Sequence, residues 1–226
     1  MKELEVAKKY GIELSESQLE AFESYYSLLI EWNNKFNLTA ITDRQGVAEK
    51  HFLDSLLGAK HFHGKICDVG SGAGFPALPL AIFNPSLSVF MIDSLNKRVN
   101  FLNEVCTKLN LQGKALHFTA EEASSPKQLR ESFDVVTARA VAPMDILPEL
   151  TAPLVKVGGS LVLYKGQPSP EDEQGAKDAE KYGCTYQGKE EFVLPDGSKR
   201  TIYLFKKTKH TPNQYPRKGL RKKGKK

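Results

Sequence analysis

Three glycines within five residues, flanked by apolar segments, constrain this chain more than any other feature of its sequence. The segment 68–76 reads DVGSGAGFP, follows the compact apolar run KICDV and leads into a second apolar run. Gly70, Gly72 and Gly74 allow the backbone to turn sharply and to lie directly against a ligand, because they have no Cβ. In an open α/β sheet such a turn lies outside the carboxyl ends of the strands, where small molecules bind. The segment therefore predicts a ligand site at a strand-to-helix turn.

Short apolar strands alternate with amphipathic helices on both sides of this turn. We expect seven strands, at residues 65–69, 88–93, 115–118, 133–138, 159–166, 191–195 and 200–207. We expect helices between them at residues 76–83, 95–111, 145–155 and 170–183. Strands separated by helices form a mostly parallel sheet that is covered on both faces, and Asp196-Gly197 predicts a closing hairpin. The predicted fold class is α/β and Rossmann-like.

Residues 1–60 are predicted to form a helical extension ahead of this sheet. Ser15 is a plausible N-cap because Gln18 follows three residues later, as in a capping box. Apolar residues then recur at helical spacing as far as Phe36. A second helix is expected at residues 47–57.

The second N-terminal helix carries His51, Asp54 and Ser55, the side-chain types of a hydrolase triad. At spacings of three and four residues on one helix these side chains run parallel, so we expect no proton relay among them. A role in facing a substrate or in packing the helix is the preferred interpretation.

The glycine spacing distinguishes between two classes of nucleotide-like ligand. A dinucleotide fingerprint needs a third glycine at the position that Phe75 occupies here. Asp68 directly precedes the loop, which suits an ammonium or sulfonium group, and Asp93 at the end of the second strand is placed to accept ribose hydroxyls. The pattern resembles the S-adenosylmethionine motif of class I methyltransferases. A nicotinamide-dependent enzyme, or a turn that serves only helix packing, are the alternatives.

Three later strand ends supply further candidates. Ala120 and Glu121 follow the third strand, where the fold places the adenine of a cofactor, although such acids also favour a helix start by themselves. Arg139 ends the fourth strand and is a candidate to bind phosphate or a guanine edge, or to close over the cofactor. Lys165 lies at the end of the fifth strand and is a candidate phosphate ligand. A role in a surface ion pair is the alternative for both Arg139 and Lys165.

The positive charge of the chain is concentrated at its C-terminus. The net charge is +5, but the residues from 206 onward include ten Lys and Arg and no acid. The rest of the chain is therefore net negative, and the localised charge indicates a polyanionic partner. We expect residues 207–226 to form a basic, flexible tail. A merely solubilising tail is the alternative.

Other features exclude several classes of protein. No run of 18 or more apolar residues is present, and the N-terminus lacks the pattern of a signal peptide. Cys67, Cys106 and Cys184 are widely spaced, without metal-ligand spacing, so we expect reduced, packed thiols. A cytoplasmic protein without a metal or a membrane partner is predicted.

Taken together, these segments resemble those of the bacterial 16S ribosomal RNA guanine-N7 methyltransferases, also called small-subunit methyltransferase G or glucose-inhibited division protein B. The segments that carry the resemblance are FNLTAI at 36–41, HFLDSL at 51–56, DVGSGAGFPALPLAI, IDSLNKRVNFL, the turn at 120–121, ARA at 138–140, Lys165-Gly166 and YPRKG at 215–219. They run in order from about residue 20 to 220. Ala77 departs from the glycine that is usual in the family, and a methyl group there is a small change.

The resemblance implies a class I methyltransferase domain at residues 61–206 that binds S-adenosylmethionine. It implies cofactor contacts beyond Asp68, Gly72, Gly74 and Asp93, at Gly70, Phe75, Ala120, Glu121 and Arg139. It also implies a guanine in a loop of 16S ribosomal RNA, or of the small ribosomal subunit, as the target. We expect a monomer. The candidate RNA contacts are Arg139, Lys165, Arg217, Lys218, Arg221 and Lys222. A small-molecule methyltransferase and a non-catalytic ribosome-associated RNA-binding protein are the alternatives.

Methylation at guanine N7 makes modest chemical demands on a protein. N7 has an in-plane lone pair and no proton to lose, so no general base is required. The sulfonium methyl is already activated, and the transfer needs mainly positioning. We therefore assign no catalytic side chain from the sequence.

Overall fold

The computed structural model describes residues 1–220, which contain a seven-stranded sheet with the order β3-β2-β1-β4-β5-β7-β6. The strands are β1 Lys65–Val69, β2 Ser88–Asp93, β3 Gly113–His117, β4 Phe133–Arg139, β5 Val155–Lys165, β6 Cys184–Val193 and β7 Lys199–Lys207. Strand β7 runs antiparallel to β5 and β6, and the other neighbouring pairs are parallel. The mostly parallel seven-stranded sheet that the sequence predicts is confirmed.

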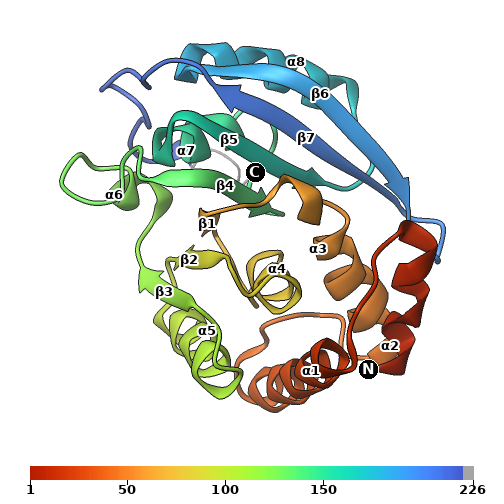
Figure 1. Ribbon diagram of the computed structural model, residues 1–226. Helices are drawn as coiled ribbons and strands as arrows, with labels where there is room; N and C mark the ends of the chain where they lie inside the picture. Colours follow the sequence, from red (N-terminus) through yellow and green to blue (C-terminus); the bar gives the residue numbers. More distant parts are fainter. Residues whose placement is uncertain (221–226) are drawn as a thin grey trace.

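Helices cover both faces of the sheet (Figure 1). The α-helices are α1 Glu16–Phe36, α2 Arg44–Gly46, α3 Asp54–Leu56, α4 Ala77–Phe83, α5 Asn96–Lys108, α6 Ala120–Ala123, α7 Leu147–Thr151 and α8 Pro170–Lys177. The 3₁₀ segments are Lys2–Tyr10, Ala59–His61, Ala152–Leu154 and Asp178–Tyr182, and a π-helix spans Val47–Leu53. In Figure 1, α1, α4 and α5 lie on one side of the sheet, and α6, α7 and α8 lie on the other.

Each face of the sheet has its own hydrophobic core, because neighbouring residues of a strand point to opposite faces. On β1, Ile66 packs into the core with α1, α4 and α5, and Cys67 packs into the core with α6, α7 and α8. Burial on both faces explains why the central strands occur in the sequence as continuous apolar runs. The carboxyl ends of the parallel strands consequently meet at one edge, between the two helical layers.

The N-terminal helices pack directly against this frame. Helix α1 begins at the predicted cap, where the Ser15 hydroxyl accepts from the Gln18 amide and the Gln18 side chain accepts from the Ser15 amide. Its residues Phe22 and Tyr25 are fully buried, and the Tyr25 hydroxyl donates to the carbonyl oxygen of Ala73 in the glycine-rich turn. Residues 1–60 therefore help to hold the turn in place.

Several elements differ from the expected ones; for example, the helix expected at residues 145–155 is α7 followed by a 3₁₀ segment, and β5 already begins at Val155. Residues 47–53 form a π-helix, a geometry that often occurs at functional sites. Strand β6 begins at Cys184 and not near residue 191, because pairing with β7 extends it through a polar stretch whose composition does not favour a strand. The predicted hairpin is confirmed, with Gly197 at φ 82° and the Leu194 amide donating to the Ser198 carbonyl oxygen at 2.9 Å.

Candidate active site

The glycine-rich turn joins β1 to α4 and is fastened to the end of β2. Gly70, Gly72 and Gly74 have φ values of 71°, 58° and 98°, a region that residues with a Cβ rarely adopt. The Gly70 amide donates to the carbonyl oxygen of Ile92 at 2.7 Å, and the Gly72 amide donates to Oδ2 of Asp93 at 2.9 Å. All three glycines are thus required by the backbone of the turn.

The turn has two features that fit a cationic cofactor. Asp68 is completely buried at the end of β1, and among the described residues neither of its carboxylate oxygens has a hydrogen-bond partner of good geometry, although Ser71 and the Ala77 amide lie close enough to lower its pKa by less than burial raises it. Burial raises the pKa of Asp68 to about 7. A Cβ built on Gly72 would meet only the Gly70 carbonyl oxygen, at 3.9 Å, so the turn faces open space there. A buried, unpaired carboxylate beside an open backbone turn suits a ligand with an ammonium or sulfonium group.

Asp93, predicted from the sequence to accept from the cofactor ribose, also holds the glycine-rich turn in place. Its Oδ2 accepts from the Gly72 amide, and its Oδ1 accepts from the Leu95 amide at 3.0 Å, just before α5. Arg98 lies 3.4 Å from Oδ2. The carboxylate therefore holds the turn to the start of α5, and its predicted contact with the cofactor ribose would use the remaining lone pairs.

Phe75 connects the turn to the N-terminal helical region. Its ring stacks on the His51 imidazole, with centroids 4.4 Å apart and planes 19° apart. The Arg139 guanidinium carbon lies 5.0 Å from the centroid of the same ring. Phe75 itself is buried, with 6% of its surface exposed. The predicted contact of Phe75 with the cofactor stays a prediction, but the structure assigns it the role of joining β1, β4 and the π-helix.

Arg139 and Arg200 converge on one carboxylate. Arg139 donates from Nη1 to Oδ2 of Asp54 at 2.8 Å, and Arg200 Nε lies 3.2 Å from the same oxygen. Asp54 is buried, and its Oδ1 has no partner among the described residues. Two guanidinium groups thus share a single acid, and neither has another acidic partner among residues 1–220. Sequence reasoning missed Arg200, which shows no periodicity or motif.

His51 lies between these groups and the turn. Its Nδ1 is 3.2 Å from Nη2 of Arg139, and its Nε2 is 2.9 Å from Oγ1 of Thr39. Nδ1 also lies 3.2 Å from the carbonyl oxygen of Lys50, so a donor and an acceptor both face this nitrogen. Burial, together with the charge of Arg139, lowers the pKa of His51 to about 3. The imidazole is therefore neutral, and Ser55 donates to the carbonyl oxygen of His51 and takes no part in a relay.

A cavity of about 410 Å³ opens at the carboxyl ends of β4 and β5 beside this cluster. Its walls come from the π-helix, the ends of β4 and β5, and the start of β7. The basic side chains that line it are Lys50, Arg139, Lys165 and Arg200. A neighbouring cavity of about 570 Å³ shares Lys165 and Ala140 with it and is also lined by Asp145, Glu171 and Asp172. Lys165, predicted from the sequence, is thus at the junction of the two cavities, 3.1 Å from Asp172.

The turn after β3 is ordered by its own cap. The Thr119 hydroxyl accepts from the Glu122 amide, and the Glu122 carboxylate accepts from the Thr119 amide, as in a capping box. Ala120 is buried at the start of α6, and Glu121 is half-buried beside it. Both lie at the carboxyl edge of the sheet, and their contacts with an adenine stay a prediction.

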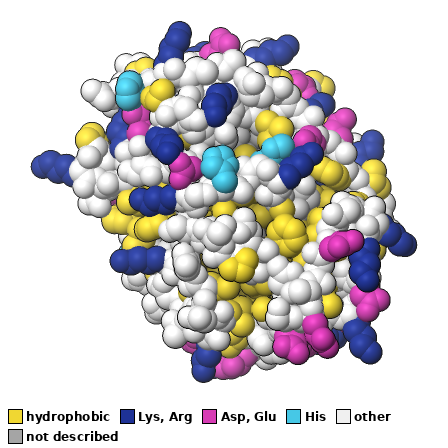
Figure 2. All heavy atoms as spheres, viewed as in Figure 1, with side chains coloured by type: hydrophobic (Ala, Val, Ile, Leu, Met, Phe, Trp, Pro, Cys, Tyr) yellow, Lys and Arg dark blue, Asp and Glu magenta, His cyan; other side chains and the backbone are white. Residues whose placement is uncertain are grey.

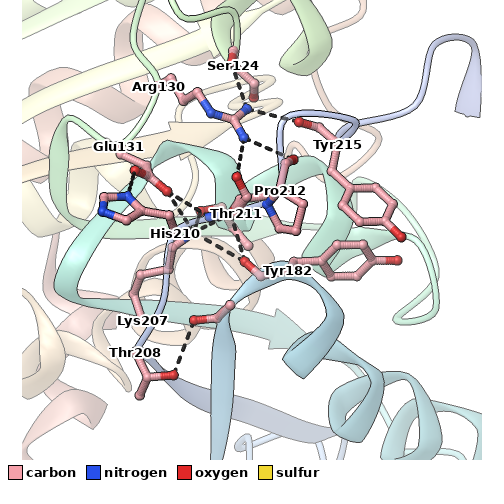
Figure 3. Close-up of polar contacts among 12 residues, drawn as sticks. Ser124, Arg130, Glu131, Tyr182, Lys207, Thr208, His210, Thr211, Pro212 and Tyr215 are labelled. Carbon is pink, nitrogen blue, oxygen red and sulfur yellow. Dashed lines mark hydrogen bonds and ion pairs between the residues drawn. The ribbon is translucent and has the colours of Figure 1, made fainter.

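The basic segment after β7 is attached to the body of the protein (Figure 3). We call residues 208–217 the C-terminal strap. The Lys207 amine is buried and donates to the carbonyl oxygens of Ala152 at 2.7 Å and Tyr182 at 3.3 Å and to the Thr211 hydroxyl. Arg130 donates to the strap carbonyl oxygens of Thr211, Pro212 and Tyr215. Buried donors and acceptors therefore dock residues 207–217, the part of the expected flexible tail that these contacts cover, and residues 221–226 of that tail lie outside the described residues.

The predicted RNA contacts at the C-terminus have different surroundings. Arg217 forms an ion pair at 2.7 Å with Glu149, whose side chain is completely buried, and also donates its amide to Glu149 at 2.7 Å. Lys218 is exposed. Arg221 and Lys222 lie outside the described residues. On the face drawn in Figure 2, Lys and Arg side chains are interspersed with acidic ones and do not merge into one field.

The fold and the site together define a class of protein. The sheet has the order 3-2-1-4-5-7-6 with an antiparallel β7, a glycine turn follows β1, and an acid ends β2. A buried carboxylate without a partner among the described residues lies next to that turn. These features are those of a class I S-adenosylmethionine-dependent methyltransferase.

Comparison with known proteins identifies the family. The family described as rRNA small subunit methyltransferase G matches residues 18–202. A ribosomal RNA small subunit methyltransferase G from an Exiguobacterium species is 50% identical over 222 residues, which cover 95% of this chain and 93% of the relative. One from Geobacillus kaustophilus is 50% identical and covers 92% of this chain and 90% of the relative. The chain belongs to the rRNA small subunit methyltransferase G family, which confirms the predicted enzyme class and cofactor.

Solved structures agree with the fold. The YcgJ protein from Bacillus subtilis has a TM-score of 0.53 and 14% identity, over 70% of this chain and 100% of that one. A branched-chain polyamine synthase from Thermus thermophilus has a TM-score of 0.59 and 10% identity, over 83% of this chain and 64% of that one. At these identities the likeness shows the fold alone. No helix within residues 1–220 has the length and apolar character needed to span a bilayer.

Proposed function

We propose that this enzyme transfers the methyl group of S-adenosylmethionine to N7 of a guanine in a loop of 16S ribosomal RNA, as a monomer in the cytoplasm. Membership of the rRNA small subunit methyltransferase G family supports the RNA substrate. An exposed loop is the expected target, because the major groove of a paired RNA stem is too narrow and deep for an active site to reach N7.

The observation that carries the choice of N7 is the state of the titratable groups next to the cavity. A general base works best with a pKa near the working pH, and the pKa of His51 is held at about 3 by burial and by Arg139. Asp54 is engaged by two guanidinium groups. Methylation of an exocyclic amine or a hydroxyl would need a proton acceptor, whereas N7 does not. Asp68, whose pKa is about 7, is completely buried and does not line the cavity. The residues that do line it therefore favour a ring nitrogen.

The residues of the chain act mainly by binding and orientation. S-adenosylmethionine supplies an activated methyl group when bound. We propose that Gly70, Gly72 and Gly74 provide the backbone against which it lies, that Asp68 faces its positive charge, and that Asp93 accepts from its ribose. Ala120, Glu121, Phe75 and Arg139 complete the proposed cofactor contacts. The helical region 1–60, the domain 61–206 and the basic end 207–226 would then supply the wall of the cavity, the cofactor site and RNA contacts.

Nucleoside mass spectrometry tests this proposal. The purified enzyme should form 7-methylguanosine in 16S RNA, naked or in small subunits, taken from cells that lack the gene. Methyl transfer to a small molecule but not to RNA would overturn the proposal, as would RNA binding without cofactor binding. Methylation of an exocyclic amine or a hydroxyl would overturn the assignment of the atom.

A further inference from the structure

The cation-lined cavity contains two basic residues that no cofactor motif explains. Lys50 comes from the π-helix and Arg200 from the start of β7, and both line the space next to Arg139. They are 150 residues apart in the sequence. The fold therefore brings cations from three separate segments to one opening at the carboxyl edge of the sheet.

Charge balance indicates what this cavity binds. Arg139 and Arg200 share Oδ2 of one buried carboxylate, so one of the two positive charges is uncompensated among the described residues that touch them. Burying an uncompensated charge is costly unless a ligand supplies the counter-charge. Guanidinium groups bind phosphate well because their planar donors match its oxygens.

The position and size of the cavity suit a nucleotide. Its volume of about 410 Å³ lies within the range of roughly 300–1,000 Å³ that is usual for small-ligand sites. It is joined to the glycine turn through Phe75, whose ring touches both His51 and Arg139. A group held here would lie next to the glycine turn at which the cofactor is proposed to bind.

We propose that Lys50 and Arg200 bind a phosphate group that flanks the target guanosine, with Asp54 as the positioning residue that holds Arg200 and Arg139 in place. The proposal rests on the RNA methylation proposed above and names the part of the substrate that this cavity recognises. Lys50 is held at the rim by an ion pair with Asp196 at 2.9 Å, an exposed interaction that a phosphate can replace.

Two variants, K50Q and R200Q, test the proposal with guanosine and guanosine 3′,5′-bisphosphate as probes. Binding of each probe to the protein saturated with S-adenosylhomocysteine is measured by ligand-observed NMR. The wild type should prefer the bisphosphate by about 10-fold or more, because guanosine cannot form the charge-assisted hydrogen bonds that a phosphate accepts. Each variant should reduce that preference to about 3-fold or less, and R200K should retain most of it.

The matched control is K156Q, since Lys156 also forms a surface ion pair, with Asp134, but lies at the opposite end of β5. It should leave both probe affinities unchanged. Lys50 is partly exposed, so K50Q tests the proposal even where R200Q is unstable. Calorimetry with S-adenosylmethionine on the same variants should give unchanged cofactor affinity.

The outcomes separate this inference from the proposed function. An unchanged preference in K50Q and R200Q, or no preference in the wild type, would overturn the phosphate site. A fall in cofactor affinity equal to the fall in bisphosphate affinity would also overturn it, since the bound anion would then be the cofactor carboxylate. A wild type that does not methylate RNA but shows the preference would contradict the proposed function and leave the site standing.

Discussion

The carboxyl edge of the sheet around Asp68, Asp93 and Asp54, which we call the cofactor edge, and the C-terminal strap are both rich in charged groups. The charged groups of the two regions differ in whether they have partners. At the cofactor edge, both carboxylate oxygens of Asp68 and one of Asp54 lack a partner among the described residues. In the strap region, the buried Lys207 amine is bonded to two carbonyl oxygens and a hydroxyl, and Glu149 is bonded by Arg217 and Tyr182. Unpartnered polar atoms are typical of a ligand site, whereas partnered ones stabilise the fold. Substitutions at the cofactor edge should therefore change ligand binding, and substitutions in the strap region should change the stability of the fold.

The largest effect on stability is expected for K207A. The substitution removes one donor each from the Ala152 and Tyr182 carbonyl oxygens and from the Thr211 hydroxyl, which should lower the free energy of unfolding by about 1–3 kcal/mol. Urea denaturation measures this change. The neighbouring, exposed Lys206 provides the control, since K206A should change stability by less than about 0.5 kcal/mol. Weaker cofactor binding in folded K207A, with stability unchanged, would contradict the assignment of Lys207 to the stability of the fold.

The opposite result is expected for D68N at the cofactor edge. Removal of the carboxylate should weaken S-adenosylmethionine binding at pH 8 by about 10-fold, because the cofactor cation then faces a neutral amide, without lowering the free energy of unfolding. The pKa of Asp68 in the folded protein is about 7, above its ordinary value of 3.8. Its contribution to stability is therefore full below about pH 4 and declines as the pH rises to about 7.

Stability measurements between pH 4 and 8 check this sign. The wild type should become less stable over that range relative to D68N, and calorimetry supplies the cofactor affinity. A D68N protein that is less stable than the wild type at pH 8, yet binds the cofactor normally, would show that Asp68 is a structural residue.

A truncation after Leu220 should have a moderate effect that is confined to RNA binding. It removes five Lys and Arg and leaves the strap intact. For each RNA phosphate that is no longer neutralised, the slope of log affinity against log salt should fall by about 0.7. Filter binding at several salt concentrations measures the slope, and urea denaturation should be unchanged. A full-length variant with Gln at these five positions separates charge from length. An unchanged slope in both proteins would assign RNA binding to the body alone.

The smallest effect is expected for E149Q, in the pH dependence of stability. Burial alone would raise the pKa of Glu149, but hydrogen bonds and charge from Arg217 outweigh it, so the pKa is below its ordinary value of 4.5. The contribution of Glu149 to stability is thus present above about pH 4.5 and is lost as the pH falls through the folded-state value. Thermal unfolding of E149Q should show a shallower decline below pH 4.5 than the wild type. An identical acid profile would show that the strap is not held by this ion pair.

The parts of the site that could be predicted are those that local sequence determines. The glycine turn, its preceding Asp68 and the acid at the end of β2 lie close along the chain, and their backbone requirements are visible in the residue types. The cavity could not be predicted, because Lys50, Arg139 and Arg200 meet only through the strand order of the sheet and the packing of the N-terminal helices. His51 and Asp54 were recognisable as unusual, but their partner Arg139 is more than 80 residues away.

The basic residues near the C-terminus also have partners that could not be predicted from the sequence. Charge counting located Arg217 correctly in a basic segment, but it could not show that Glu149 anchors it or that Lys207 is buried. The sequence by itself determined the alternation of strands and helices and the sharp turn that we propose binds the cofactor, since periodicity and glycine act over a few residues. Only the tertiary structure decided which charges face a ligand and which hold the fold together, because pairing and burial depend on groups that are distant in the chain.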